Sequence, residues 1–200
     1  MHKGRLEAFS DGVIAIIITI MVLELKAPHE ASLSSLWHLS GEFLSYVLSF
    51  TYIAIYWNNH HHMLQASRRV SGRVLWANMH LLFWLSMVPF VTNWMGATSF
   101  APIPVGAYGF VLLMAGAAYY VLARTLLACH EPDSPLAKAI GNDVKGKLSL
   151  LIYVVAMGLS FVDIRLSCGL YAIVAAMWLI PDLRIERELT NGSHSHPEPG

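Results

Sequence analysis

The sequence predicts an all-α integral membrane protein with six transmembrane helices. Of the 200 residues, 56% are hydrophobic and 13% are charged, whereas about a quarter of the residues in a soluble domain are charged. The apolar residues gather in runs that reach or approach the roughly 20 residues needed to cross a bilayer. We therefore expect residues 1–189 to form one membrane domain and residues 190–200 to form a polar, disordered tail.

The six expected spans are separated by segments rich in polar residues, glycine and proline. They cover residues 6–25, 36–64, 74–95, 103–129, 148–162 and 166–180. Pro28 ends the first span, and Ser34 or Ser35 is expected to cap the second. Pro89 lies inside the third span and is expected to kink it, which membrane helices tolerate. Asp11 and the lack of a small-residue cleavage site argue against a cleaved signal peptide.

The placement of charge predicts the orientation in the membrane. If the N-terminus is cytoplasmic, all of the 13 lysines and arginines except Lys26 and Arg165 lie on the inner side. The positive-inside rule then places both termini in the cytoplasm, in agreement with an even number of spans. Cys129 and Cys168 fall near opposite membrane faces, so no disulfide is expected between them. The formal net charge of zero gives no basic surface for nucleic acid.

Polar residues of three spans are predicted to meet in one layer near the inner membrane face. Asp11 begins the apolar part of the first span, residues 57–62 end the second, and Trp76 and Asn78 begin the third. An ionisable residue inside a span is by default a candidate functional group with a nearby partner. The expected network comprises Ser10, Asp11, Asn58 or Asn59, His60 or His61, and the indole N–H of Trp76. The alternative is that Asp11 is simply solvated in the headgroup zone.

The run of histidines at 60–62 raises the alternative of a metal site. Successive helical residues point about 100° apart, so three consecutive histidines face three directions. Zinc sites prefer ligands at helical spacing i, i+4 or from several helices. A histidine that forms structural hydrogen bonds is therefore favoured, and no metal site is predicted.

The first span carries an apolar stripe with one hydroxyl beside it. Ile16, Ile20 and Leu23 follow one another at i, i+4 and i+7, and Thr19 lies next to them. The uncharged stretch 12–23 rises about 18 Å, which is short of the roughly 30 Å hydrocarbon core. A helix that is polar at both membrane faces suits a protein centre, where copies around a symmetry axis would form hydrophobic rings. The alternative is an ordinary packing stripe.

Three blocks of sequence carry a resemblance to a known family. The first is "R-x-x-x-F-S-D-G", made by Arg5, Phe9, Ser10, Asp11 and Gly12. The second is "YWNNHH" over 56–61, and the third is "LWANMHLLFWLSMVPF" over 75–90. Together they resemble the signature of the transmembrane protein 175 family closely over the first half of the chain. The six-span layout extends the resemblance loosely to the second half.

The resemblance implies a potassium-permeable cation channel without a re-entrant filter loop, and not an enzyme. In that family the first helix of each repeat lines the pore, and prokaryotic members with one repeat form homotetramers. This chain carries one repeat, so the resemblance implies a homotetramer in a bacterial inner membrane that needs no cofactor beyond the permeant potassium. By the same resemblance, Ile16 forms the constriction, Thr19 contributes to selectivity, and Ile20 and Leu23 form further rings.

The resemblance also implies a gating role for a set of residues at the inner helix ends. These residues are Arg5, Phe9, Ser10, Asp11, Trp57, His60, His61, Trp76 and Asn78. One rival hypothesis is a proton-coupled secondary transporter that uses Asp11 and a histidine of the second span as a relay. A membrane enzyme or metal exporter built on the histidine run is the weaker rival, because the spans offer it no convincing second carboxylate or cysteine ligand.

Overall fold

Helices make up all the regular structure of the described residues. The computed structural model describes residues 3–28, 30–67, 70–131, 134, 137 and 143–179. Its helices are α1 (Lys3–Leu23), α2 (Leu33–His38), α3 (Ser40–Ala66), α4 (Gly72–Ser86), α5 (Val88–Ala97), α6 (Pro102–Leu127), α8 (Val144–Leu159) and α9 (Ile164–Leu179). The tail predicted over residues 190–200 lies outside the described residues.

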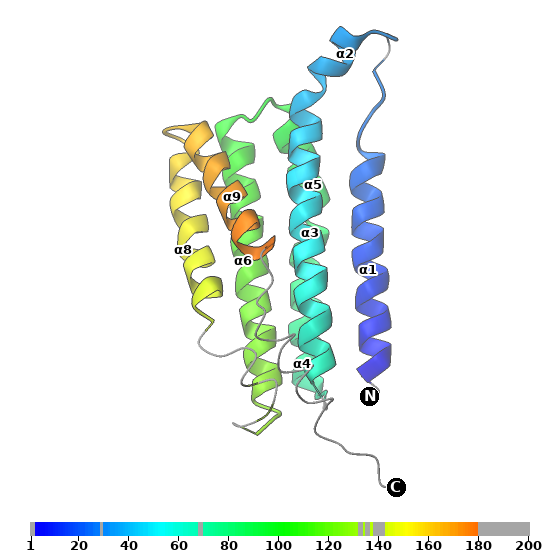
Figure 1. Cartoon of the computed structure of the whole chain (residues 1–200), viewed down its shortest axis with the longest axis vertical. Helices are drawn as coiled ribbons and strands as arrows, with labels where there is room; N and C mark the ends of the chain where they lie inside the picture. Colours follow the sequence, from blue (N-terminus) through cyan, green and yellow to red (C-terminus); the bar gives the residue numbers. More distant parts are fainter. Residues whose placement is uncertain are drawn as a thin grey trace, which may run out of the picture.

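The long helices lie side by side in one bundle with α1 at its edge. Figure 1 shows α1 at one edge of the bundle, beside α3, and α8 at the opposite edge. Helix α6 packs against α4, α5, α8 and α9, and α3 packs against α5 and α9. Helix α1 packs against α3, α4 and α5 in the first half of the bundle. Much of the surface of α1 is therefore left without a partner in the single chain.

Buried hydroxyl groups join the helices at the centre of the bundle. The Tyr52 hydroxyl donates to the carbonyl of Tyr171 at 2.6 Å, which joins α3 to α9. The Tyr171 hydroxyl donates to the carbonyl of Val105 at 3.2 Å, which joins α9 to α6. The Ser49 hydroxyl donates to the Tyr108 oxygen at 3.1 Å, which joins α3 to α6. Each side chain is buried, and pairing its hydroxyl avoids the cost of an unsatisfied polar group in an apolar interior.

Three helical stretches are long and apolar enough to cross a membrane, and they match the first, third and fourth predicted spans. They are Lys3–Leu23, Gly72–Ala97 and Pro102–Leu127. Helix α3 has 27 residues, but its second half carries the polar run at 57–62. Helices α8 and α9 have 16 residues each, which corresponds to about 24 Å. The described helices thus agree with a membrane protein, and the count of six spans stays a prediction.

Two predicted spans are divided by short interruptions. The second begins as α2, is interrupted at Leu39 and continues as α3. Its first cap is Ser32, whose Oγ accepts from the Ser35 backbone N–H at 3.2 Å, so the predicted cap at Ser34 or Ser35 is wrong. The third span is interrupted at Met87, and Pro89 lies in the first turn of α5. A proline is tolerated there because that turn has no intrahelical acceptor for its missing N–H.

Candidate pore helix and its inner hydrogen-bond network

Helix α1 has a buried face and an exposed face. The buried face consists of Leu6, Ser10, Ile14, Ile17 and Met21, each 4% exposed or less. On the exposed face Ile16 is 60% exposed, Ile20 is 42% exposed and Leu23 is 74% exposed. At 100° per residue the centres of these two sets lie roughly 110° apart around the helix. The predicted stripe lies to one side of the packed face and stays exposed, so it is not a packing stripe within the chain.

Thr19 lies on the exposed face together with the three apolar residues. Its hydroxyl donates to the Ala15 carbonyl at 2.9 Å, one turn earlier in the same helix. This bond uses the hydroxyl proton and leaves the oxygen lone pairs free to accept or to coordinate a cation. The exposed face of α1 therefore combines large apolar side chains with one oxygen ligand, placed between Ile16 and Ile20 in the sequence.

A buried chain of hydrogen bonds joins the ends of α1, α3 and α4 that are predicted to lie at the inner membrane face. The Asn78 amide Nδ2 donates to Ser10 Oγ at 3.0 Å, and the Asn78 Oδ1 lies 2.7 Å from His60 Nε2. Ser10 in turn donates to the Leu6 carbonyl at 2.9 Å. Because the Asn78 oxygen faces the ring, the proton of this hydrogen bond belongs to His60 Nε2. All three side chains are at most 1% exposed, so the chain is shielded from solvent.

Asp11 is held by a different aromatic partner from the one predicted. The indole Nε1–H of Trp57 donates to Asp11 Oδ1 at 3.0 Å, and the Trp57 ring stacks on the His61 ring with centroids 5.7 Å apart. The prediction that the indole N–H of Trp76 would join this network is wrong. Trp76 is 79% exposed and faces outward on α4. The rotation of α4 about its axis places Asn78 inside and Trp76 outside.

The remaining predicted residues lie outside the hydrogen-bonded groups. Arg5 and Phe9 are exposed on α1, and Asn58 is exposed on α3. The Asn59 amide donates to the Ile55 carbonyl of its own helix at 2.8 Å. Of the predicted alternatives, His60 joins the buried chain, and neither Asn58 nor Asn59 does.

A polar pair at the outer end of α1 was not predicted. Asn93 Nδ2 donates to Glu24 Oε2 at 2.9 Å and thereby joins the outer ends of α1 and α5. The sequence shows Glu24 as the residue that closes the apolar run, but nothing marks Asn93 as its partner. In the part of the chain that the structure describes, no three His, Cys, Asp or Glu side chains gather closely enough to hold a metal ion.

Comparisons with known proteins identify the family. The family model described as the endosomal/lysosomal potassium channel TMEM175 matches residues 5–89. A potassium channel from Chryseobacterium sp. (strain P1-3) is 50% identical over 189 residues, which cover 94% of this chain and 98% of the relative. The chain belongs to the transmembrane protein 175 family. The resemblance read from its three sequence blocks is therefore confirmed, and the family is one of ion channels rather than enzymes.

A solved member of the transmembrane protein 175 family shares the fold. The crystal structure of a lysosomal potassium-selective channel TMEM175 homolog from Chamaesiphon minutus is similar with a TM-score of 0.77 and 31% identity. The match covers 89% of this chain and 96% of that one. A shorter match of 83 residues at 34% identity links the chain to the endosomal/lysosomal proton channel TMEM175 of Bos taurus, of which it covers 17%. The predicted all-α membrane fold is confirmed.

Proposed function

We propose that this protein is a potassium-permeable cation channel in which four copies of α1 surround a central pore. Six spans cross a bacterial inner membrane and leave both termini in the cytoplasm. The names of two relatives support the permeant ion, since the proteins from Chryseobacterium and Chamaesiphon are both called potassium channels or potassium-selective. The proposal places every copy of α1 with its buried face on its own bundle and its exposed face on the axis.

The uncovered face of α1 carries this proposal. Ile16, Ile20 and Leu23 are exposed apolar side chains of a helix that packs on its own bundle through another face. A groove beside them is lined by Phe90 and Asn93 of α5, so this side of the chain is shaped as well as apolar. Around a fourfold axis the three residues form stacked apolar rings, and Thr19 adds a ring of hydroxyl oxygens between Ile16 and Ile20.

The chemistry of these rings accounts for a preference for potassium over sodium. A narrow apolar ring offers few ligands to replace the water that an ion loses on entering it. Potassium holds its hydration shell less strongly than sodium, so it loses less free energy at the Ile16 ring. The Thr19 oxygens offset part of the remaining cost. We expect graded selectivity, weaker than that of a filter built from backbone carbonyls.

The inner network is proposed to fix α1 in relation to α3 and α4 during gating. The Ser10–Asn78–His60 chain and the Asp11–Trp57 bond all lie near the inner end of α1. A movement of α1 relative to α3 and α4 that widens the pore breaks these bonds, whereas a joint movement of the three helices keeps them. We propose the same coupling for Arg5, Phe9, His61 and Trp76, which lie on the same inner part of the bundle.

A proton-coupled transporter is the second candidate, because a family member is called a proton channel. A relay would pass a proton between Asp11 and a histidine of α3. In the structure Asp11 is bonded to Trp57, and His60 is bonded to Asn78 rather than to Asp11. These separate partners favour a structural role for both groups over a relay.

Recordings from purified protein in planar bilayers test the proposal. We expect single-channel steps and, under a potassium–sodium gradient, a reversal potential that shifts toward the equilibrium potential of potassium. Saturable flux coupled to protons, without single-channel steps, would instead support the transporter.

Thr19→Ala tests the proposed oxygen ring. We expect its potassium-to-sodium permeability ratio to fall several-fold, since the hydroxyls no longer offset the dehydration of the ion. Thr51→Ala is the matched control, because Thr51 forms the same type of bond within α3, to the Val47 carbonyl at 2.8 Å. An unchanged ratio in Thr19→Ala, or an equal change in both variants, removes Thr19 from the pore.

Ile16→Asn tests the proposed constriction. An amide in place of the apolar side chain hydrates the ring, so we expect sodium conductance to rise relative to potassium conductance. Conductance and selectivity equal to those of the unaltered protein would place the constriction elsewhere.

A further inference from the structure

An open hollow of about 880 Å³ lies between α4 and α6, where α4 begins and α6 ends. We call it the arginine hollow, and its polar and aromatic lining includes Ser71, Arg73, Trp76, Tyr120, Arg124 and Thr125. Helix α4 starts at Gly72 and α6 finishes at Leu127, so both helices bring their inner ends to this site. The arginine hollow takes no part in the proposed pore, which uses the exposed face of α1.

Two arginines give the arginine hollow a positive charge. Arg73 and Arg124 are exposed, and among the described residues that line the hollow none is a carboxylate. Among the residues that the structure describes, the ion pair is Lys3 with Glu7, and neither arginine side chain has a hydrogen bond or ion pair. Two guanidinium groups that line one hollow attract an anion whose several oxygens can accept hydrogen bonds from both of them.

The hollow changes from charged to apolar with depth in the membrane. Helix α4 runs away from the inner end, so Trp76 lies about one turn deeper than Arg73. Helix α6 runs toward that end, so Tyr120 and Val121 lie about one turn deeper than Arg124. Trp76 is 79% exposed and Val121 is 45% exposed. Tryptophan and tyrosine are typical of the membrane interface, where one end of a side chain is apolar and the other is wet.

This order of groups matches a phospholipid with a charged head and an apolar tail. Basic pockets between helices at the cytoplasmic membrane face bind acidic lipid headgroups. We propose that the arginine hollow binds the phosphate of an anionic phospholipid through Arg73 and Arg124, while an acyl chain lies against Trp76 and Val121. The inference goes beyond ion conduction and concerns lipid binding, so it is tested by a binding measurement that needs no current.

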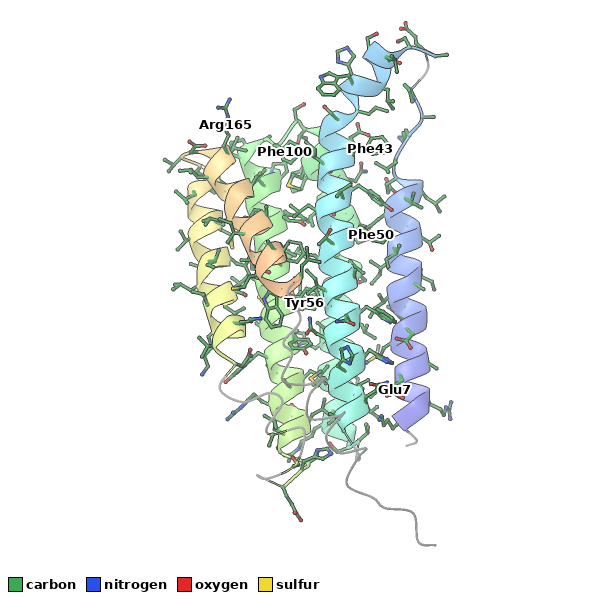
Figure 2. The ribbon with its side chains drawn as sticks, in the orientation of Figure 1. Glu7, Phe43, Phe50, Tyr56, Phe100 and Arg165 are labelled. Carbon is green, nitrogen blue, oxygen red and sulfur yellow. The ribbon has the colours of Figure 1, made fainter. Side chains whose placement is uncertain are left out.

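Native mass spectrometry of the purified full-length protein measures this binding directly. Phosphatidylglycerol is titrated into protein held in a neutral detergent, and phosphatidylcholine is titrated in parallel. We expect the double variant Arg73→Gln with Arg124→Gln to bind phosphatidylglycerol about 25-fold more weakly, at about fivefold for each arginine near a membrane surface. Binding of phosphatidylcholine is expected to stay unchanged. Arg165→Gln is the matched control, since Figure 2 shows Arg165 at the opposite end of the bundle from Glu7.

Five outcomes overturn the proposal. The first is that the double variant retains full affinity for phosphatidylglycerol. The second is that Arg165→Gln weakens this affinity as much as the double variant does. Millimolar glycerol phosphate or inorganic phosphate displaces the lipid, which shows that the hollow takes a soluble anion. The glutamine variant retains its lipid but dissociates into single chains, which shows that a second copy covers the hollow. If the glutamine variant loses both its assembly and its lipid, the double variant Arg73→Lys with Arg124→Lys decides between the explanations. We expect this lysine variant to retain part of its lipid binding, because its positive charges still bind the phosphate. Complete loss of lipid binding contradicts the proposal.

Discussion

Asn78 serves two buried partners from two other helices, so its loss should weaken the inner end of the bundle. Asn78→Ala leaves His60 Nε2 without its partner and removes the donor to Ser10 Oγ. A buried polar group without a partner costs about 1–3 kcal/mol. We expect the free energy of unfolding in detergent to fall by about that amount, as measured by denaturant titration. Asn58→Ala is the control, because Asn58 is exposed on α3, and it should change the value by less than about 0.5 kcal/mol. Equal effects of the two variants would contradict the buried chain.

Variants of Trp57 and Trp76 test which of these two tryptophans is the partner of Asp11. Trp57→Phe keeps an aromatic ring against His61 but removes the donor to Asp11, so we expect a loss of about 1 kcal/mol in stability. Trp76→Phe removes an indole N–H that makes no hydrogen bond to Asp11, so the same measurement should barely change. A larger loss of stability for Trp76→Phe than for Trp57→Phe would instead indicate Trp76 as the partner of Asp11, as the sequence predicts.

The sequence predicts which residues share a depth in the membrane but not which of them touch. Depth follows from the rise of 1.5 Å per residue, and it correctly brings Ser10, His60 and Asn78 to one layer. Contact depends in addition on the rotation of each helix, which changes by 100° with every residue. Trp76 and Asn78 differ by two positions, so one faces outward when the other faces inward. The sequence alone does not fix that rotation.

At the scale of the elements, α5 packs against α3 through a position where a side chain does not fit. A Cβ atom on Gly96 would lie 2.9 Å from the Glu42 Cα and 2.7 Å from the Ser45 Oγ. Gly96→Ala therefore forces α5 away from the backbone of α3, and overpacking of this kind costs about 1–3 kcal/mol. We expect a matching fall in stability by denaturant titration.

Gly158→Ala on α8 is the control for this prediction, because a Cβ there meets nothing within 4 Å. Its helical position makes alanine neutral or slightly stabilising. If Gly158→Ala lowers stability as much as Gly96→Ala does, close approach of α5 and α3 is not the reason that Gly96 is a glycine.

The extent of the helices follows well from apolar runs, and their interruptions follow less well. Pro89 marks the break in the third span, although α4 ends at Ser86, before the proline. The break at Leu39 has no glycine or proline signal between Leu36 and Ser40. The stripe on α1 is visible in the sequence, but only the structure shows that its side chains stay exposed beside the packed face.

The proposed pore requires several copies of the whole chain around one axis. The chain has a mass of 22.2 kDa, and we expect the purified protein in mild detergent to have four times that mass by light scattering after subtraction of the detergent. A stable assembly of two copies, or a single chain that still conducts, would contradict the proposed pore. Only the family resemblance predicts four copies, because the exposure of one helix face does not determine how many neighbours surround it.

The proposed channel depends on the exposed face of α1 lining the conduit. Modification of single introduced cysteines, with Cys129 and Cys168 replaced by serine, tests it most directly. A positively charged, water-soluble thiol reagent is applied from the outer side during potassium current recording. We predict that Leu23→Cys, on the exposed face, is blocked within minutes, while Met21→Cys, 3% exposed and packed on the bundle, is not. A current that resists the reagent at Leu23→Cys but is blocked at Met21→Cys would contradict the account.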